Sequence, residues 1–156
     1  MRFLCLALTI TLAACASEPT APAPDQAAVF AQAVDAELVV ASTPNAMAYA
    51  TTEVTAPAGA TVRLVMDNRG TTSPAMLHNV VVVRTQGDVE RVGQAGAGDP
   101  DHLPDDPAVI AGTAIAQPGA RTAVVFTMPP PGRYPYVCAY PGHYLMMRGT
   151  LVSTPR

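Results

Sequence analysis

The sequence predicts an all-β domain, a sandwich of about eight short strands, and three observations support this prediction. The chain has 156 residues, about the length of one domain. It contains 16 Pro and 11 Gly, which divide it into short segments and disfavour long helices. Most segments between these breaks are short and rich in β-branched or apolar residues, as strands are.

The expected strands begin at residue 37 and follow one another with short connections. They cover residues 37–41, 48–55, 61–67, 78–84, 108–115, 121–127, 134–138 and 148–153. In the third of them, Val62, Leu64 and Met66 alternate with their neighbours, which indicates a strand with one face in the core. Turn residues separate the strands at 57–59, 68–70, 118–119 and 129–132.

One connection, residues 86–107, is too long for a simple turn. It is polar and rich in Gly and Asp, and a short helix is expected around residues 88–94. Loops of this length usually carry a function or lack fixed structure. His102 lies among several Asp residues of this insert, so a solvated acidic loop is expected there, with a second metal site as the weaker alternative.

The N-terminus has the features of an export signal. Arg2 is followed by an apolar run, residues 3–12, that is too short to span a bilayer. The segment Leu12-Ala-Ala-Cys15 resembles the lipobox of bacterial lipoproteins, which implies a signal peptide of residues 1–14 and lipidation of Cys15. Ala16 rather than Asp follows this cysteine, which favours the outer membrane and the periplasmic side. The alternative is an ordinary signal peptide and a soluble periplasmic protein.

Residues 15–36 are expected to form a lipidated tether rich in Ala and Pro, ahead of a domain of residues 37–156. The first part of the tether has too little apolar surface to fold. Residues 26–36 place Val29, Phe30, Ala33 and Val34 at roughly helical spacing, so they form either a short helix or more linker.

Charge and cysteine content argue against two classes of protein. All nine basic residues are Arg, the net charge is −3 and the isoelectric point is about 5.4, which argues against a nucleic-acid binder. Three cysteines cannot form a fully paired disulfide framework. Cys5 would leave with the signal peptide and Cys15 would carry lipid, so Cys138 is the one thiol of the domain.

Residues 136–151 contain a thiol, an imidazole and a thioether within ten positions, at Cys138, His143 and Met147. Pro141 and Gly142 supply a tight bend, so the loop should direct the three side chains into one volume. His78, at the start of a Val-rich strand, is the candidate for a further strong ligand. Two His and one Cys with a weak axial Met form the ligand set of blue-copper sites, whereas Zn²⁺ normally takes four strong ligands.

This loop resembles the copper loop of azurin and auracyanin, small cupredoxins of the plastocyanin/azurin family. The resemblance rests on Cys-x-x-Pro-Gly-His at residues 138–143 and Met-Arg-Gly-Thr-Leu at 147–151, and it extends to the segments 78–79 and 103–111. It implies a cupredoxin-like Greek-key sandwich of eight strands. It also implies one copper ion, with His78, Cys138 and His143 as strong ligands and Met147 as the axial ligand.

The resemblance also implies roles for residues around these ligands. The carbonyl of Leu77 is a possible weak axial contact, although azurin has Gly at this position. Asn79 is expected to brace the ligand loop, and the N–H groups of Asn79 and Tyr140 are expected to bond the thiolate.

The expected function is electron transfer between redox proteins, such as c-type cytochromes or membrane oxidoreductases, by a monomer with the edge of His143 as the electron port. Met47, Met76, Leu77, Pro141 and Gly142 would form an apolar docking face around that edge. An enzyme is not expected, because copper enzymes of this type have His after the copper-binding Cys, and this chain has Ala139. The alternative is a copper-binding or delivery lipoprotein that uses the same site.

Overall fold

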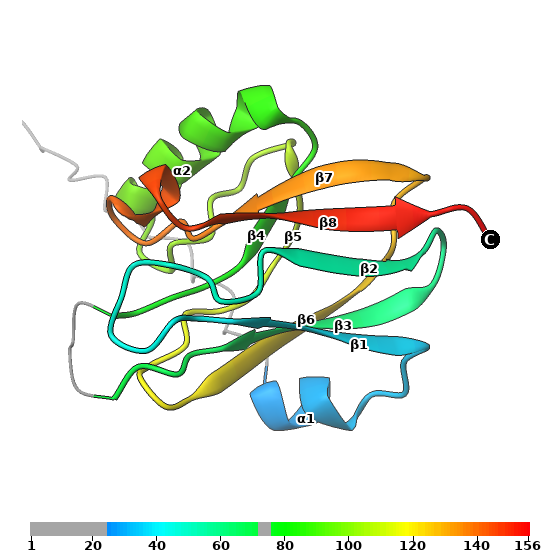
Figure 1. The fold of residues 1–156 in the computed structure, drawn as a ribbon, viewed down its shortest axis with the longest axis horizontal. Coiled ribbons are helices and arrows are strands. Elements are labelled where there is room, and N and C mark those ends of the chain that lie inside the picture. Colours follow the sequence, from blue (N-terminus) through cyan, green and yellow to red (C-terminus); the bar gives the residue numbers. More distant parts are fainter. Residues whose placement is uncertain (1–24, 72–75) are drawn as a thin grey trace, which may run out of the picture.

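The computed structural model describes residues 25–71 and 76–156, and it contains eight strands in two sheets (Figure 1). The predicted all-β sandwich is therefore confirmed. The expected signal peptide, Cys15 and the beginning of the tether lie outside the described residues. Among the described residues, no helix has the length and apolar character needed to cross a membrane.

The smaller sheet has three strands in the order β1-β3-β6. These are β1 (Ala36–Ala41), β3 (Thr61–Asp67) and β6 (Arg121–Thr127). β3 pairs with β1 in parallel and with β6 in antiparallel orientation.

The larger sheet has five strands in the order β2-β8-β7-β4-β5. These are β2 (Glu53–Pro57), β8 (Arg148–Thr154), β7 (Gly132–Val137), β4 (Val81–Val83) and β5 (Val109–Gly112). Within this sheet β2 and β8 pair in parallel, and the other neighbouring strands pair in antiparallel orientation. The non-sequential order, in which β4 and β7 are neighbours, is consistent with a Greek-key connection.

The core lies between the two sheets. Val62, Leu64 and Met66 of β3 point into it, as their alternation predicts, and they share it with Val82 of β4 and Leu151 of β8. Three expected strands are shorter than predicted. β2 begins at residue 53, the segment expected at 78–84 pairs as a ladder only over Val81–Val83, and the one expected at 108–115 covers Val109–Gly112.

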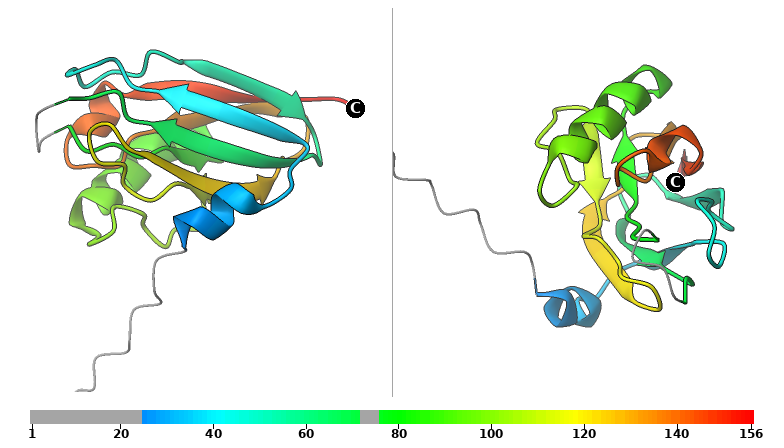
Figure 2. Two further views of the ribbon diagram at one scale, coloured as in Figure 1. Left: turned by 90° about the horizontal axis from the view of Figure 1, so that it is seen from below. Right: turned by 90° about the vertical axis from the view of Figure 1, so that its left-hand side faces the viewer.

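Helix α1 (Gln26–Ala31) covers the outer face of the smaller sheet, below β6 in the left view of Figure 2. Val29 packs with Val65 and Ala123, so β3 is buried on both faces. For residues 26–36 the sequence left open a short helix or more linker, and the structure has the helix. The expected tether of residues 15–36 thus includes a segment that packs on the domain.

Arg63 of β3 links α1 to the smaller sheet by hydrogen bonds. Its Nε donates to the carbonyl of Val29 across 3.2 Å, Nη2 donates to the carbonyl of Gln32, and Nη1 pairs with Glu37 across 3.0 Å. The guanidinium also lies 5.9 Å from the ring centre of Phe30. A buried cation therefore satisfies carbonyl groups at the end of a very short helix.

Helix α2 (Val89–Gly98), preceded by the 3-10 turn η1 (Gln86–Asp88), covers the outer face of the larger sheet. It continues four residues beyond the predicted end at residue 94. Gly93 and Gly96 allow the longer helix to pack closely against the segment 139–144. A Cβ on Gly96 would lie 2.6 Å from the Cβ of Ala139, and a Cβ on Gly93 would overlap Tyr144. α2 thus rests directly on the segment that follows Cys138.

Candidate metal centre

The four side chains predicted to bind metal are all buried at one end of the sandwich. Cys138 follows β7, His143 begins the 3-10 turn η2 (His143–Leu145), and Met147 precedes β8. His78 lies ahead of β4 and forms an isolated bridge with Ala116. Exposed fractions are 1% for His78, 3% for His143 and 0% for Cys138 and Met147.

Local hydrogen bonds close the loop between β7 and β8. The Cys138 N–H donates to the Met147 carbonyl across 3.1 Å, and the Met147 N–H donates to the His143 carbonyl across 2.8 Å. Gly142 takes a left-handed conformation with φ of 80°, which glycine adopts without steric cost. The predicted Pro-Gly bend therefore turns His143 back towards Cys138.

Three donor atoms form a small triangle in this buried volume. The two Nδ1 atoms of His78 and His143 are 3.3 Å apart, and the Cys138 Sγ lies 4.0 Å from the first and 3.6 Å from the second. A metal ion about 2.0–2.1 Å from each nitrogen and about 2.3 Å from the sulfur, in a trigonal plane, needs separations of roughly 3.5–3.8 Å. The triangle matches these values, and the donor set therefore fits a copper ion of the blue type.

Burial changes the proton affinity of all three groups. It lowers the pKa of His78 to about 4, with a smaller contribution from His143, and it also lowers the pKa of His143. Burial raises the pKa of the Cys138 thiol to about 11, although backbone N–H groups of Asn79 and Tyr140 act in the opposite direction. At neutral pH the imidazoles are therefore neutral and free to bind metal, and a bound ion must displace the thiol proton.

Asn79 connects the two parts of the chain that carry the predicted strong ligands. Its Oδ1 accepts the N–H of Ala139 across 2.8 Å, and its own N–H, like that of Tyr140, is directed at the Cys138 sulfur. Tyr49 donates its hydroxyl proton to the Asn79 carbonyl. Asn79 and Tyr140 thus lie where the sequence prediction puts them, beside the thiol.

Asn68 is a buried residue whose part in the site the sequence analysis missed. Its Nδ2 donates to the carbonyls of Met76 and Ala116, across 2.7 and 2.8 Å, while its Oδ1 accepts from Ser42 and Gly70. The only signal in the sequence was the Asn68-x-Gly70 turn. Through Ala116 this side chain supports the bridge that holds His78.

Leu77 is partly buried next to the first predicted ligand. Its backbone carbonyl faces the His78 imidazole and partly offsets the fall in the pKa of that ring. Its side chain lines an apolar cavity of about 650 Å³ together with residues of α1, β5, β6 and the 100–103 segment. The axial contact of the Leu77 carbonyl remains a prediction.

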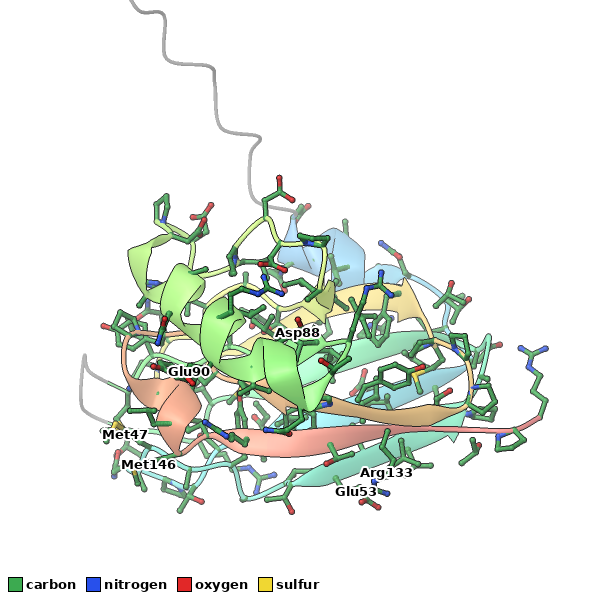
Figure 3. The ribbon with its side chains drawn as sticks, turned by 90° about the horizontal axis from the view of Figure 1, so that it is seen from above. Met47, Glu53, Asp88, Glu90, Arg133 and Met146 are labelled. Carbon is green, nitrogen blue, oxygen red and sulfur yellow. The ribbon has the colours of Figure 1, made fainter. Side chains whose placement is uncertain are left out.

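An apolar surface surrounds the copper loop. Leu145 and Met146 of this loop are 62% and 67% exposed, and Met47 is 38% exposed. Figure 3 shows Met47 and Met146 at the same end of the molecule. Of the predicted docking face, Met47, Pro141 and Gly142 are exposed, whereas Met76 and Leu77 are half-buried.

Residues 36–153 match the family model described as copper binding proteins, plastocyanin/azurin family. The chain belongs to this family. The predicted resemblance to auracyanin and azurin is therefore confirmed, and copper is the cofactor that the family binds.

Curated relatives are similar over most of the domain. The chain is 39% identical over 122 residues to auracyanin-B of Chloroflexus aurantiacus, a match that covers 74% of this chain and 51% of the relative. Azurin iso-2 of Methylomonas sp. strain J is 36% identical, with 69% of this chain and 89% of the relative covered. The chain thus spans about half the length of auracyanin-B.

Solved structures agree with these similarities. The auracyanin B structure has a TM-score of 0.71 at 36% identity, covering 80% of this chain and 92% of that one. Reduced auracyanin of Roseiflexus castenholzii has a TM-score of 0.69 at 35% identity, covering 77% and 97%. The fold of the chain is therefore that of these auracyanins.

Proposed function

We propose that this protein is a one-electron carrier whose copper is held by His78, Cys138 and His143, with Met147 as a weak axial ligand. The supporting observation is the buried triangle of two Nδ1 atoms and one Sγ, 3.3–4.0 Å apart. A copper ion in such a site supplies a Cu(I)/Cu(II) couple. Auracyanin A, at 36% identity, is described as a "blue" copper protein.

The protein's contribution is a site that changes little when the charge of the metal changes. Each strong ligand is buried, and the loop that carries two of them is closed by its own backbone hydrogen bonds. A hydrogen bond from Ala139 to Asn79 connects that loop to the segment of His78. The protein itself therefore helps to fix the positions of the ligands, in addition to the metal. A thioether at Met147 imposes no strong geometric preference on either oxidation state.

Electrons are exchanged through the edge of His143, the most exposed of the three strong ligands. Around it, Met47, Leu145 and Met146 offer an apolar surface to a redox protein that docks weakly and leaves quickly. We propose c-type cytochromes or membrane oxidoreductases as the class of partner, a monomeric carrier, and no enzymatic activity.

The carrier acts on the periplasmic side of a membrane, anchored by lipid on Cys15, with the outer membrane favoured. The support is the segment Leu12-Ala-Ala-Cys15 after a short apolar run. Intact mass of the membrane-extracted protein tests this proposal, since lipidation adds the mass of the acyl groups and cleavage removes residues 1–14.

Absorption and EPR spectra of the copper-loaded protein test the proposed function. The unsubstituted chain should show an intense blue thiolate-to-copper band and a reversible one-electron potential. Cys138→Ser should lose both, whereas the matched variant Cys15→Ser should keep both. A blue band that survives in Cys138→Ser would overturn the ligand assignment, and rapid copper loss without a reversible potential would indicate a delivery protein instead.

A further inference from the structure

Three aromatic rings contact one another in succession, from the long insert to a proposed copper ligand. The ring centre of His102 lies 4.9 Å from that of Tyr140, edge to face at 72°. The ring centre of Tyr140 lies 4.9 Å from that of His143, tilted by 58°. Both spacings fall within the range of favourable aromatic contacts.

His102 itself is held firmly in the loop that follows α2. Its Nδ1 lies 2.8 Å from the Gly96 carbonyl, which can only accept, so this nitrogen carries a proton and donates it. Its backbone is left-handed, with φ of 54°, a conformation that few side chains other than Asn, Asp and His adopt readily. The loop thus accepts an uncommon backbone conformation where it presents this imidazole to Tyr140.

The backbone of His102 also contacts the site by a second path. Its carbonyl accepts the side-chain amide of Asn79 across 2.8 Å, while the other end of that amide accepts the N–H of Ala139. The insert is therefore connected to the copper loop by a ring contact and by a hydrogen bond.

The loop that carries His143 packs on α2 through Tyr144, but part of its outer side faces solvent. Leu145 and Met146 are largely exposed, and Gly142 has no side chain. The rings of Tyr140 and His78 both contact the ring of His143, with centre distances of 4.9 and 5.1 Å.

We propose that His102 is a positioning residue for the copper ligand His143 and acts on it through the ring of Tyr140. This inference rests on the proposed copper site and deepens it. Residues that orient a metal ligand from outside typically change metal affinity by about 10–100-fold when they are replaced. The ring contact, rather than the hydrogen bond from Asn79 to the backbone, carries the effect.

A double-mutant cycle on the full-length protein separates the two paths. His102→Asn removes the ring but retains the backbone carbonyl and suits a left-handed backbone. Tyr140→Leu removes the intermediate ring, and Tyr140→Phe keeps it. Asp101→Glu is the matched control, an exposed neighbour whose charge is unchanged.

Two readouts are measured on each folded variant, with folding checked by circular dichroism. The first is the affinity for Cu(II) in competition with a chelator, and the second is the EPR hyperfine coupling together with the midpoint potential. We expect His102→Asn to weaken Cu(II) binding about tenfold. We expect a shifted hyperfine coupling and potential in His102→Asn, and a smaller change in Tyr140→Phe than in Tyr140→Leu because the ring is retained. Asp101→Glu should stay within twofold of the parent.

The cycle decides whether His102 acts through Tyr140. In the Tyr140→Leu background, His102→Asn should cause no further loss, because the ring that transmits its effect is absent. An unchanged affinity and spectrum in His102→Asn would overturn the proposal, as would a full tenfold loss that persists in that background. If His102→Asn does not fold, His102→Gly replaces it in the same cycle. Absence of a blue band in the parent would instead count against the proposed function.

Discussion

The side chain of Asn79 accepts the backbone N–H of Ala139 across 2.8 Å, in a buried position where no solvent can replace it. This contact joins the segment of His78 to that of Cys138, two parts of the chain separated by 60 residues. It connects the segment ahead of β4, which carries the proposed ligand His78, with the loop that carries the other proposed ligands.

Replacement of Asn79 by Ala should loosen both halves of the metal centre. The N–H of Ala139 would be left buried without a partner, which costs about 1–3 kcal/mol of unfolding free energy. Copper affinity should fall by about 10–100-fold. Urea unfolding of the metal-free chain and chelator competition measure the two effects. Unchanged values for both would show that Asn79 does not brace the site.

Gly96 of α2 should not tolerate a methyl group. A Cβ there would lie 2.6 Å from the Cβ of Ala139 and 3.0 Å from its carbonyl oxygen, so Gly96→Ala must displace the helix or the copper loop. We expect a loss of about 1–3 kcal/mol in stability together with a changed copper spectrum.

Gly98→Ala is the matched control in the same helix, because a Cβ at Gly98 has no neighbour within 4 Å. It should be neutral or stabilising by up to about 1 kcal/mol. Equal thermal stability of the two variants would contradict the close contact between α2 and Ala139.

Arg63→Met should release α1 from the smaller sheet. The arginine makes three polar contacts, two of them to carbonyls of the helix and the residue after it, and its side chain is only 11% exposed. Charge-assisted hydrogen bonds contribute about 1.5–3 kcal/mol each when made by a buried group. Hydrogen exchange of residues 26–32 should therefore become faster, and unfolding should occur at lower urea.

Arg133→Met provides the comparison for this variant. Arg133 also pairs with a carboxylate, Glu53, across 2.7 Å, but both side chains are more than half exposed, and Figure 3 shows them at the surface. Such a pair contributes about 0–1 kcal/mol. Similar losses of unfolding free energy in Arg63→Met and Arg133→Met would show that Arg63 does not hold α1 on the smaller sheet.

Stability of the metal-free protein should fall between pH 7 and pH 5. The pKa of His78 is lowered to about 4 and that of His143 is also lowered, whereas in the unfolded chain both lie near 6.5. In this range the unfolded state takes up protons that the folded state does not bind, so acid favours unfolding. Glu37 has a lowered pKa and contributes to acid loss mainly below its ordinary value of 4.5.

Thermal unfolding of the metal-free chain at half-unit pH steps measures this dependence. His78→Gln should flatten it by removing one of the two responsible groups, and bound copper should suppress it because protons and metal compete for the same nitrogens. A pH-independent midpoint between 7 and 5 would show that the imidazoles are not buried as neutral groups.

The copper loop could be predicted from sequence because its geometry is local. Cys138 and His143 are five residues apart, and a Pro-Gly bend between two strands leaves few conformations for the chain. The alternation of Val62, Leu64 and Met66 similarly predicted which face of β3 enters the core, because side chains alternate along every strand.

Local spacing could not predict which distant segments meet at the site. The position of His78 against Cys138 depends on the pairing of β4 with β7, and Asn68 supports it through the bridge to Ala116. The contact of His102 with Tyr140 depends on where α2 ends, which the close approach of Gly96 to Ala139 decides.

The sequence alone therefore determined the strands, the chemistry of the ligand set and the family to which the chain belongs. Tertiary structure alone decided that β3 is buried on both faces, that Arg63 bonds to carbonyls of α1, and that an insert imidazole contacts the ring next to a proposed ligand. The physical reason is that periodicity and short loops are set by neighbouring residues. Contacts between remote segments are set by how the two sheets and their helices pack together.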